Sequence, residues 1–314
     1  MLNWKKLGHV FAADGRYPWM QQFGQVPTAH RLDDRIRVYF SCRPNPDANG
    51  DFVSQTTFLD VELDDPTRII DVHDKPILAL GELGSFDQFG VMPCCAIQVD
   101  GDIRLYYVGW SRSRGVPWQA AVGLAISSDG GTTFERHAAG PILSRTAEEP
   151  FVQGSPWVLK QDDQFRMWYL SGIRWEEHQG HQESIYRLMS ATSADGINWI
   201  RDAKECLPPT SPDECQARPA VWQSDSHYHM LFSSRRGIDF RNAQRGYNIG
   251  YATSKDGIAW SRDDSRAGLE RSVAGWDSEM ISYPNVVQVD GRRLCFYCGN
   301  MMGHAGFGVA ELVH

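Results

Sequence analysis

Carboxylate side chains gather just ahead of five prolines that recur along this chain. The prolines are Pro27, Pro93, Pro156, Pro219 and Pro284. Four of the five preceding segments carry at least one acid, and the first segment carries none. The acids singled out are Asp87, Glu149, Glu214, Asp277 and Glu279. Two carboxylates facing one substrate can divide the work, with one donating a proton and the other acting as base or nucleophile. The pattern therefore indicates acid–base chemistry.

Arginines form a second set, after the aromatic-ended run that follows each proline. The segments after the second runs of the first four units contain Arg43, Arg112, Arg174 and Arg235. The corresponding segment of the fifth unit contains His304 instead. Arginine presents a planar fork of donors that suits carboxylate or phosphate. These arginines either bind such a group or pair with the acids above, and the two interpretations are compatible. The candidate binding residues are Gln25, Arg43, Trp110, Arg112, Arg174, Arg218, Arg235, Tyr283 and His304.

The spacing of the prolines predicts the fold that positions these residues. The prolines lie 66, 63, 63 and 65 residues apart. Each opens a short apolar run, a polar turn and an aromatic-ended run, which is the pattern of two strands joined by a hairpin. A third strand, an Asp-Gly turn and a fourth strand follow, as in residues 123–134, 189–199 and 250–260. Five units of four strands predict an all-β, five-bladed β-propeller.

The fifth unit lacks a fourth strand, because its third strand near Gly308 almost ends the chain. Residues 4–11 resemble the missing strand, so we expect them to complete blade five and close the ring. Closure hides sheet edges that would otherwise pair with other chains. Residues 1–314 are therefore expected to form a single propeller domain.

In a propeller blade the first strand lines the central channel. Residues just before that strand and just after the second strand lie at the same mouth, because the two strands are antiparallel neighbours. The acids and the arginines should therefore meet at one funnel, as binding residues gather in loops on a rigid scaffold. We expect Arg43, Arg112, Arg174, Arg218 and Arg235 to converge there.

Composition excludes several classes of partner. The net charge of −8 and the pI near 5.7 argue against nucleic acid and anionic membranes. The N-terminus lacks the apolar core of a signal peptide, no apolar run is long enough to span a membrane, and the seven scattered cysteines indicate reduced thiols. A cytoplasmic protein is expected. No phosphate-binding, dinucleotide-binding or zinc-protease motif is found, so no cofactor or metal is expected.

Three phrases carry a family resemblance: Gly84–Pro93, Glu214–Pro219 and Trp276–Pro284. With them the whole chain resembles the five-bladed propeller glycosidases of glycoside hydrolase families 32, 43 and 130, as an uncharacterised bacterial branch. The resemblance implies a glycoside hydrolase in bacterial surface-polysaccharide metabolism, with a carbohydrate or nucleotide-sugar substrate. Glu214 would be the general acid, Asp87 or Glu279 the base, and Asp277 and Glu149 orienting groups.

The chain departs from that family pattern at two places. Where families 32 and 43 carry an Asp in blade one and in blade three, this chain has Val26 and Ser155. Glu214 and Cys215 are similar to the Glu-Cys of family 32. Two alternatives to a hydrolase therefore stay open: a non-catalytic sugar-binding propeller and a glycoside phosphorylase.

A second likeness concerns a turn. Residues 127–134 match the Asp-box of sialidases, and residues 193–199 and 254–260 are shortened copies. In that family the box is a structural turn away from the active site. The set of arginines is also reminiscent of sialidases, which grip a sugar carboxylate. An acidic or phosphorylated glycoside is therefore the expected substrate.

Overall fold

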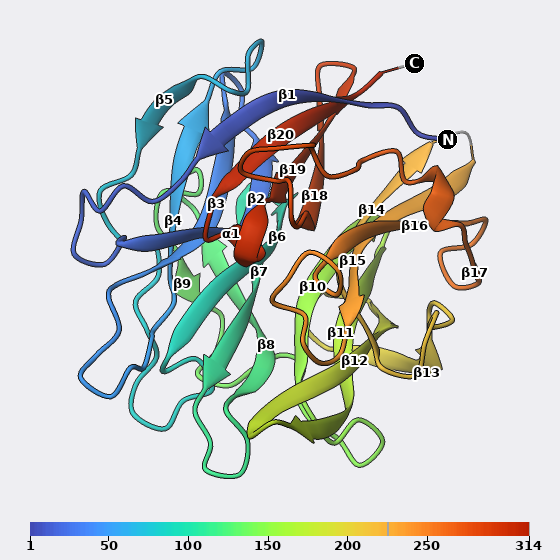
Figure 1. The fold of residues 1–314 in the computed structure, drawn as a ribbon. Coiled ribbons are helices and arrows are strands. Elements are labelled where there is room, and N and C mark those ends of the chain that lie inside the picture. Colours follow the sequence, from blue (N-terminus) through green and yellow to red (C-terminus); the bar gives the residue numbers. More distant parts are fainter. Residues whose placement is uncertain (225, 314) are drawn as a thin grey trace.

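The computed structural model describes residues 1–224 and 226–313, and it confirms the five-bladed propeller. Five antiparallel four-stranded sheets stand around a common centre (Figure 1). Blade one is β2 (Gln22–Arg31), β3 (Ile36–Arg43), β4 (Gln55–Val61) and β5 (Ile69–Val72). Blade two is β6 (Gly90–Val99), β7 (Asp102–Ser111), β8 (Gln119–Ser127) and β9 (Glu135–Arg136). Blade three is β10 (Gln153–Gln161), β11 (Gln164–His178), β12 (His181–Ser193) and β13 (Ile200–Glu205).

The last two blades follow the same order. Blade four is β14 (Glu214–Ser224), β15 (His227–Arg236), β16 (Asn248–Ser254) and β17 (Trp260–Arg262). Blade five is β18 (Ser282–Val289), β19 (Arg292–Cys298), β20 (Phe307–Leu312) and β1 (Trp4–Phe11). Two short helices interrupt the loops, a 3₁₀-helix at Asp264–Arg266 and α1 at Asn300–Gly303. None of the helices found in the described residues has the length and apolar character needed to cross a membrane.

The N-terminal strand closes the ring, as its sequence predicted. β1 pairs antiparallel with β20, with Trp4 opposite Leu312 and Phe11 opposite Phe307. The two ends of the chain therefore share one sheet, and Figure 1 shows β1 lying along β20. The inner strands β2, β6, β10, β14 and β18 contact one another in turn around the centre.

Each inner strand is irregular at its proline. The pairing of every inner strand with its neighbour shifts register there, because proline has no N–H to donate to the ladder. In four blades the residue before the proline is left-handed: Val26 (φ 52°), Ser155 (φ 49°), Arg218 (φ 53°) and Tyr283 (φ 56°). Such residues are strained, and strain of this kind concentrates at functional sites.

The Asp-box turns are structural, as the likeness implied. In the first box Asp129 accepts hydrogen bonds from the backbone N–H groups of Thr132 and Thr133, at 2.9 and 3.0 Å. Each box is also bound to the preceding blade by an aromatic side chain of that blade's second strand. These donors and their carbonyl acceptors are Tyr39 to Gly131, Tyr106 to Gly196 and Trp168 to Gly257, at 3.0 to 3.1 Å. The boxes therefore join neighbouring blades.

The core lies between blades and is made of the alternate side chains of their strands. Aromatic residues such as Trp168, Tyr107 and Phe296 are fully buried there. All seven cysteines are free and buried, so Cys206 and Cys215 do not form a disulfide in this structure.

Candidate functional site

Four of the five predicted acids are buried, with 0 to 5% of their surface exposed. Asp87 of blade two shows how they are held. Its Oδ2 accepts hydrogen bonds from the Tyr107 hydroxyl on β7 at 2.9 Å and from Nε of Arg136 on β9 at 2.8 Å. The acid thus ties the loop before the inner strand to the second and fourth strands of its own blade.

Blades three and five repeat this arrangement. In blade three, Glu149 accepts from the Tyr169 hydroxyl at 2.8 Å and pairs with Arg201 of β13 at 2.9 Å. In blade five, Asp277 accepts from the Tyr297 hydroxyl at 3.0 Å and pairs with Lys6 of β1 at 2.5 Å. We call this combination of an acid, a second-strand hydroxyl and a fourth-strand cation the blade clamp.

Blade four has a variant of the blade clamp around Glu214. Arg262 of β17 donates to both carboxylate oxygens, at 2.7 and 3.0 Å, and the Ser234 hydroxyl on β15 takes the place of the tyrosine. The backbone N–H of Thr210 adds a bond of 2.6 Å. Burial would raise the pKa of Glu214, but these hydrogen bonds and the Arg262 charge outweigh it and lower that pKa.

These contacts give each buried acid a structural role, and the catalytic roles assigned to the acids from the sequence stay predictions. The lowered pKa of Glu214 favours its ionised form, which suits a base or an ion-pair partner better than a general acid. Asp87, Glu149 and Asp277 are each held by a cation of their own blade, so the structure does not pair them across a substrate. Glu279 differs, because it is exposed and takes part in no ion pair of the described residues.

The sequence contained a signal for the blade clamp. The second strands read Tyr106-Tyr107, Trp168-Tyr169 and Phe296-Tyr297, and the second member of each pair binds the acid. In blade one the corresponding residue is Phe40, which has no hydroxyl, and that blade also has no acid before its proline. Tyrosine and acid are therefore both present in blades two, three and five and both absent from blade one, whereas blade four combines its acid with Ser234. The expected partners of the acids were the arginines after the second strands, whereas the cations come from the fourth strands.

Arg218 crosses the centre of the propeller. It stands on β14 of blade four, yet its guanidinium donates to the carbonyl of Pro93 in blade two at 2.9 Å. It also donates to the carbonyls of Val26 and Pro27 and to the Thr28 hydroxyl in blade one, at 2.8 to 3.0 Å. The side chain is 2% exposed, and its Nε has no hydrogen-bond partner. A buried positive charge thus lies at the centre on backbone carbonyls and one hydroxyl, with no carboxylate among these acceptors.

Arg235 and Arg43, which also enter no ion pair of the described residues, lie near Tyr283, the half-buried residue before the blade-five proline. Arg235 stacks on the ring of Phe240 at 3.6 Å and donates to the Tyr186 hydroxyl at 3.0 Å. That hydroxyl is hydrogen-bonded to the hydroxyl of Tyr247, whose ring lies 5.2 Å from the Tyr283 ring. The positive charge of Arg235 acts on Tyr283, whose pKa is nevertheless raised well above its usual value by burial.

Arg43 is the third arginine of this group and lies at the edge of blade one. Its guanidinium contacts the rings of Phe23 at 4.7 Å and Phe52 at 5.3 Å, and its buried Nε has no hydrogen-bond partner. Burial lowers the pKa of Arg43, while the nearby Tyr283 raises it. No ion pair of the described residues includes any of the three, which we call the axial arginines: Arg43, Arg218 and Arg235.

Some of the other predicted binding residues border the axial arginines, and the rest make contacts elsewhere in the structure. Gln25 donates to the Met302 carbonyl at 2.7 Å, and His304 packs edge-on against Phe23 at 5.1 Å, so both border the axial arginines. Arg112 pairs with Asp51 at 3.2 Å, and Trp110 packs on Phe89 at 6.2 Å. Arg174 pairs with Glu176 at 2.6 Å. Arg112 and Arg174 thus differ from the axial arginines, because nearby loop and strand acids partly neutralise their charges. The convergence of all five arginines stays a prediction.

Two mycobacterial proteins are similar to the chain over its whole length. They are "Uncharacterized protein MT1551" of Mycobacterium tuberculosis (strain CDC 1551 / Oshkosh) and "Uncharacterized protein Rv1502" of Mycobacterium tuberculosis (strain ATCC 25618 / H37Rv). Each is 34% identical over 314 residues, which cover 99% of both chains. This chain belongs to their family. No model of a described protein family matches it.

Solved structures share the fold. A protein titled "Glycoside hydrolase" superposes with a TM-score of 0.75 at 18% identity, covering 99% of this chain and 92% of its own. A thermostable family-43 glycoside hydrolase gives 0.67 at 15% identity, covering 96% and 91%. The family-32 β-fructofuranosidase BmSUC1 of Bombyx mori gives 0.61 at 14%, covering 93% and 61%. The resemblance to propeller glycosidases is thereby confirmed for the fold.

Proposed function

We propose that this glycosidase-like propeller acts on a glycoside that carries a carboxylate or a phosphate, and that the axial arginines bind this group. The observation that carries the proposal is the presence of three buried or half-buried arginines that enter no ion pair of the described residues, two of which, Arg43 and Arg235, interact with Tyr283. The glycan would come from bacterial surface-polysaccharide metabolism, the setting that the family resemblance implies.

The physical argument concerns the cost of burying charge. An arginine without a counterion loses hydration and gains little Coulomb energy, whereas a bound anion restores that energy at low local dielectric. Phe23, Phe52 and Tyr283 place aromatic rings beside Arg43 or within reach of its charge. Rings beside cationic donors suit a sugar that carries an anionic group. The overall charge of −8 makes this local excess of arginine more notable.

Arg43→Met should weaken binding of an anionic sugar about 10- to 100-fold. This is the effect of losing a hydrogen bond to a charged group, about 1.5–3 kcal/mol. Arg43→Lys should lose less, because lysine keeps the charge but not the fork. Calorimetric titration with glucuronate and glucose 6-phosphate measures both. Arg114→Met, at an exposed arginine of another loop, is the matched control. Equal affinities for wild type and Arg43→Met would contradict the proposal.

Hydrolysis would depend on Glu279, the one predicted carboxylate outside a blade clamp. Glu279→Gln should lower turnover of an aryl glycoside or a natural glycan at least 100-fold, the usual size of an acid–base contribution, with little change in stability. Release of reducing ends from acidic and phosphorylated glycans measures it. Unchanged turnover would remove Glu279 from the mechanism, and turnover that requires phosphate would identify a phosphorylase.

A non-catalytic sugar-binding propeller is the second candidate. The blade clamps favour it, because they engage four of the five carboxylates that could have catalysed a reaction. Binding of an anionic glycan without any turnover, in wild type and Glu279→Gln alike, is the result expected of this alternative.

A further inference from the structure

A cavity of about 610 Å³ opens at blade two, beside the segment that leads to blade three. Its walls come from the loop before β6, the ends of β7 and β8, and the loop before β10. The loop before β6 and the end of β7 are the same elements that carry the predicted funnel residues of blade two. The cavity therefore belongs to the same end of the propeller as the axial arginines.

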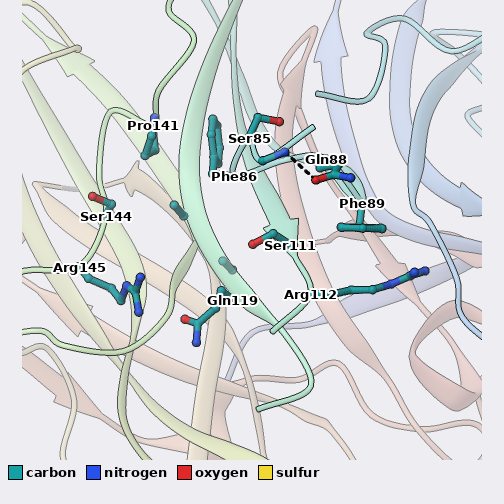
Figure 2. Close-up of a pocket in the computed structure, with 13 residues that line it drawn as sticks. Ser85, Phe86, Gln88, Phe89, Ser111, Arg112, Gln119, Pro141, Ser144 and Arg145 are labelled. Atoms are coloured by element: carbon teal, nitrogen blue, oxygen red, sulfur yellow. Dashed lines mark hydrogen bonds between the residues drawn. The ribbon is translucent and has the colours of Figure 1, made fainter. Parts of the chain in front are cut away.

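Basic, amide, hydroxyl and aromatic side chains line the cavity, together with Gly84, Ala120, Ala121 and Pro141. Figure 2 shows Gln119 and Arg145 on one side and Phe89 and Arg112 on the other, with Ser111 between them. The guanidinium of Arg112 lies over the Phe89 ring, 4.2 Å from its centre. None of the 13 described lining residues is acidic. Arg145 is exposed and enters no ion pair of the described residues.

A single residue connects this cavity to the axial arginines. The ring of Phe52 lies 5.3 Å from the Arg43 guanidinium, and the Phe52 carbonyl accepts a hydrogen bond from Arg112 at 2.9 Å. Arg112 in turn lines the cavity. A ligand that reaches across Phe52 would contact both places.

We infer that the cavity is a second sugar subsite, which takes a further residue of the same glycan, also bearing a carboxylate or phosphate. The inference rests on the proposed function for its first subsite. Arg145 supplies a positive charge, and Arg112 adds one that Asp51 partly neutralises. Gln119 and Ser111 supply groups for sugar hydroxyls, and Phe86 and Phe89 supply apolar surface. The volume of the cavity lies within the range of pockets that bind small-molecule ligands. The preferred substrate is therefore an oligosaccharide with repeated anionic groups.

Charge reversal at Arg145 tests the subsite with little risk to folding, because the side chain is exposed. Arg145→Glu should weaken binding of trigalacturonate at least tenfold and leave binding of monomeric galacturonate unchanged. Arg114→Glu, which makes the same change of net charge outside the cavity, should leave both unchanged. Crystals soaked with trigalacturonate, a phosphorylated trisaccharide and neutral maltotriose give the direct view.

The soaks separate this inference from the proposed function. An acidic or phosphorylated sugar in the cavity, with its anionic group on Arg145 or Arg112, supports the subsite. Sugar bound only beside Arg43 overturns the subsite and leaves the proposed function standing. Sugar bound only in the cavity keeps the subsite and removes the axial proposal, and sugar at neither place overturns both. Maltotriose bound as well as the charged sugars would contradict the anionic class.

Discussion

Glu214→Gln should lower the free energy of unfolding by about 3 kcal/mol, because it removes one charge of a buried ion pair and leaves Asp264 as the remaining carboxylate partner of Arg262. Glu214→Gln should lower turnover only in proportion to the fraction of the protein that it unfolds. Denaturation in urea at neutral pH measures the difference. Glu279→Gln is the matched control and should stay within about 0.5 kcal/mol of wild type, since Glu279 is exposed.

The pH dependence of this difference follows from the lowered pKa of Glu214. In the unfolded chain the carboxyl titrates near its ordinary value of 4.5, and in the folded protein it titrates lower. Its contribution is therefore complete above pH 4.5 and is lost as the pH falls through the folded value. The gap between wild type and Glu214→Gln should narrow in acid. A Glu214→Gln variant as stable as wild type but inactive would instead assign Glu214 to catalysis.

Arg218→Met should destabilise the protein by about 3–5 kcal/mol. The change leaves the carbonyls of Pro93, Val26 and Pro27 and the Thr28 hydroxyl buried with fewer donors, and each unsatisfied group costs about 1–3 kcal/mol. Arg218→Lys should cost less, because lysine keeps the charge and donates to some of these acceptors. Thermal and urea unfolding measure the series.

Arg218→Met also tests whether the centre of the propeller is held by this residue. Because the side chain links blade four to blades one and two, its loss should lower the cooperativity of unfolding as well as the midpoint. A variant with wild-type stability would mean that the inner strands hold together without it. In that case Arg218 would act only on a ligand.

The sequence was sufficient to predict the ring but not the partners of its charged residues. The proline period and the resemblance of residues 4–11 to a fourth strand specified five blades and their closure, because both depend on local pattern. The partner of Asp87 is Arg136, about 50 residues later, and nothing local distinguishes Arg136 from other arginines near strand ends. Ion pairs between strands of one blade require the register of the sheet.

The backbone conformation before the inner prolines was a second feature that the sequence did not predict. An arginine before a proline is expected to be extended. Arg218 is instead left-handed, and the bulge directs it across the axis to blades one and two. Val26, Ser155 and Tyr283 adopt the same conformation before their prolines, so the left-handed bulge recurs in four of the five blades.

The most direct test of the axial site compares sugars that differ only in an anionic group. Binding of glucuronate against glucose, and of glucose 6-phosphate against glucose, is measured by calorimetry at low and high salt. We expect the charged member of at least one pair to bind at least ten times more tightly than glucose, and salt to reduce this advantage because part of the attraction is screened. Equal affinities within both pairs, at either ionic strength, would contradict it.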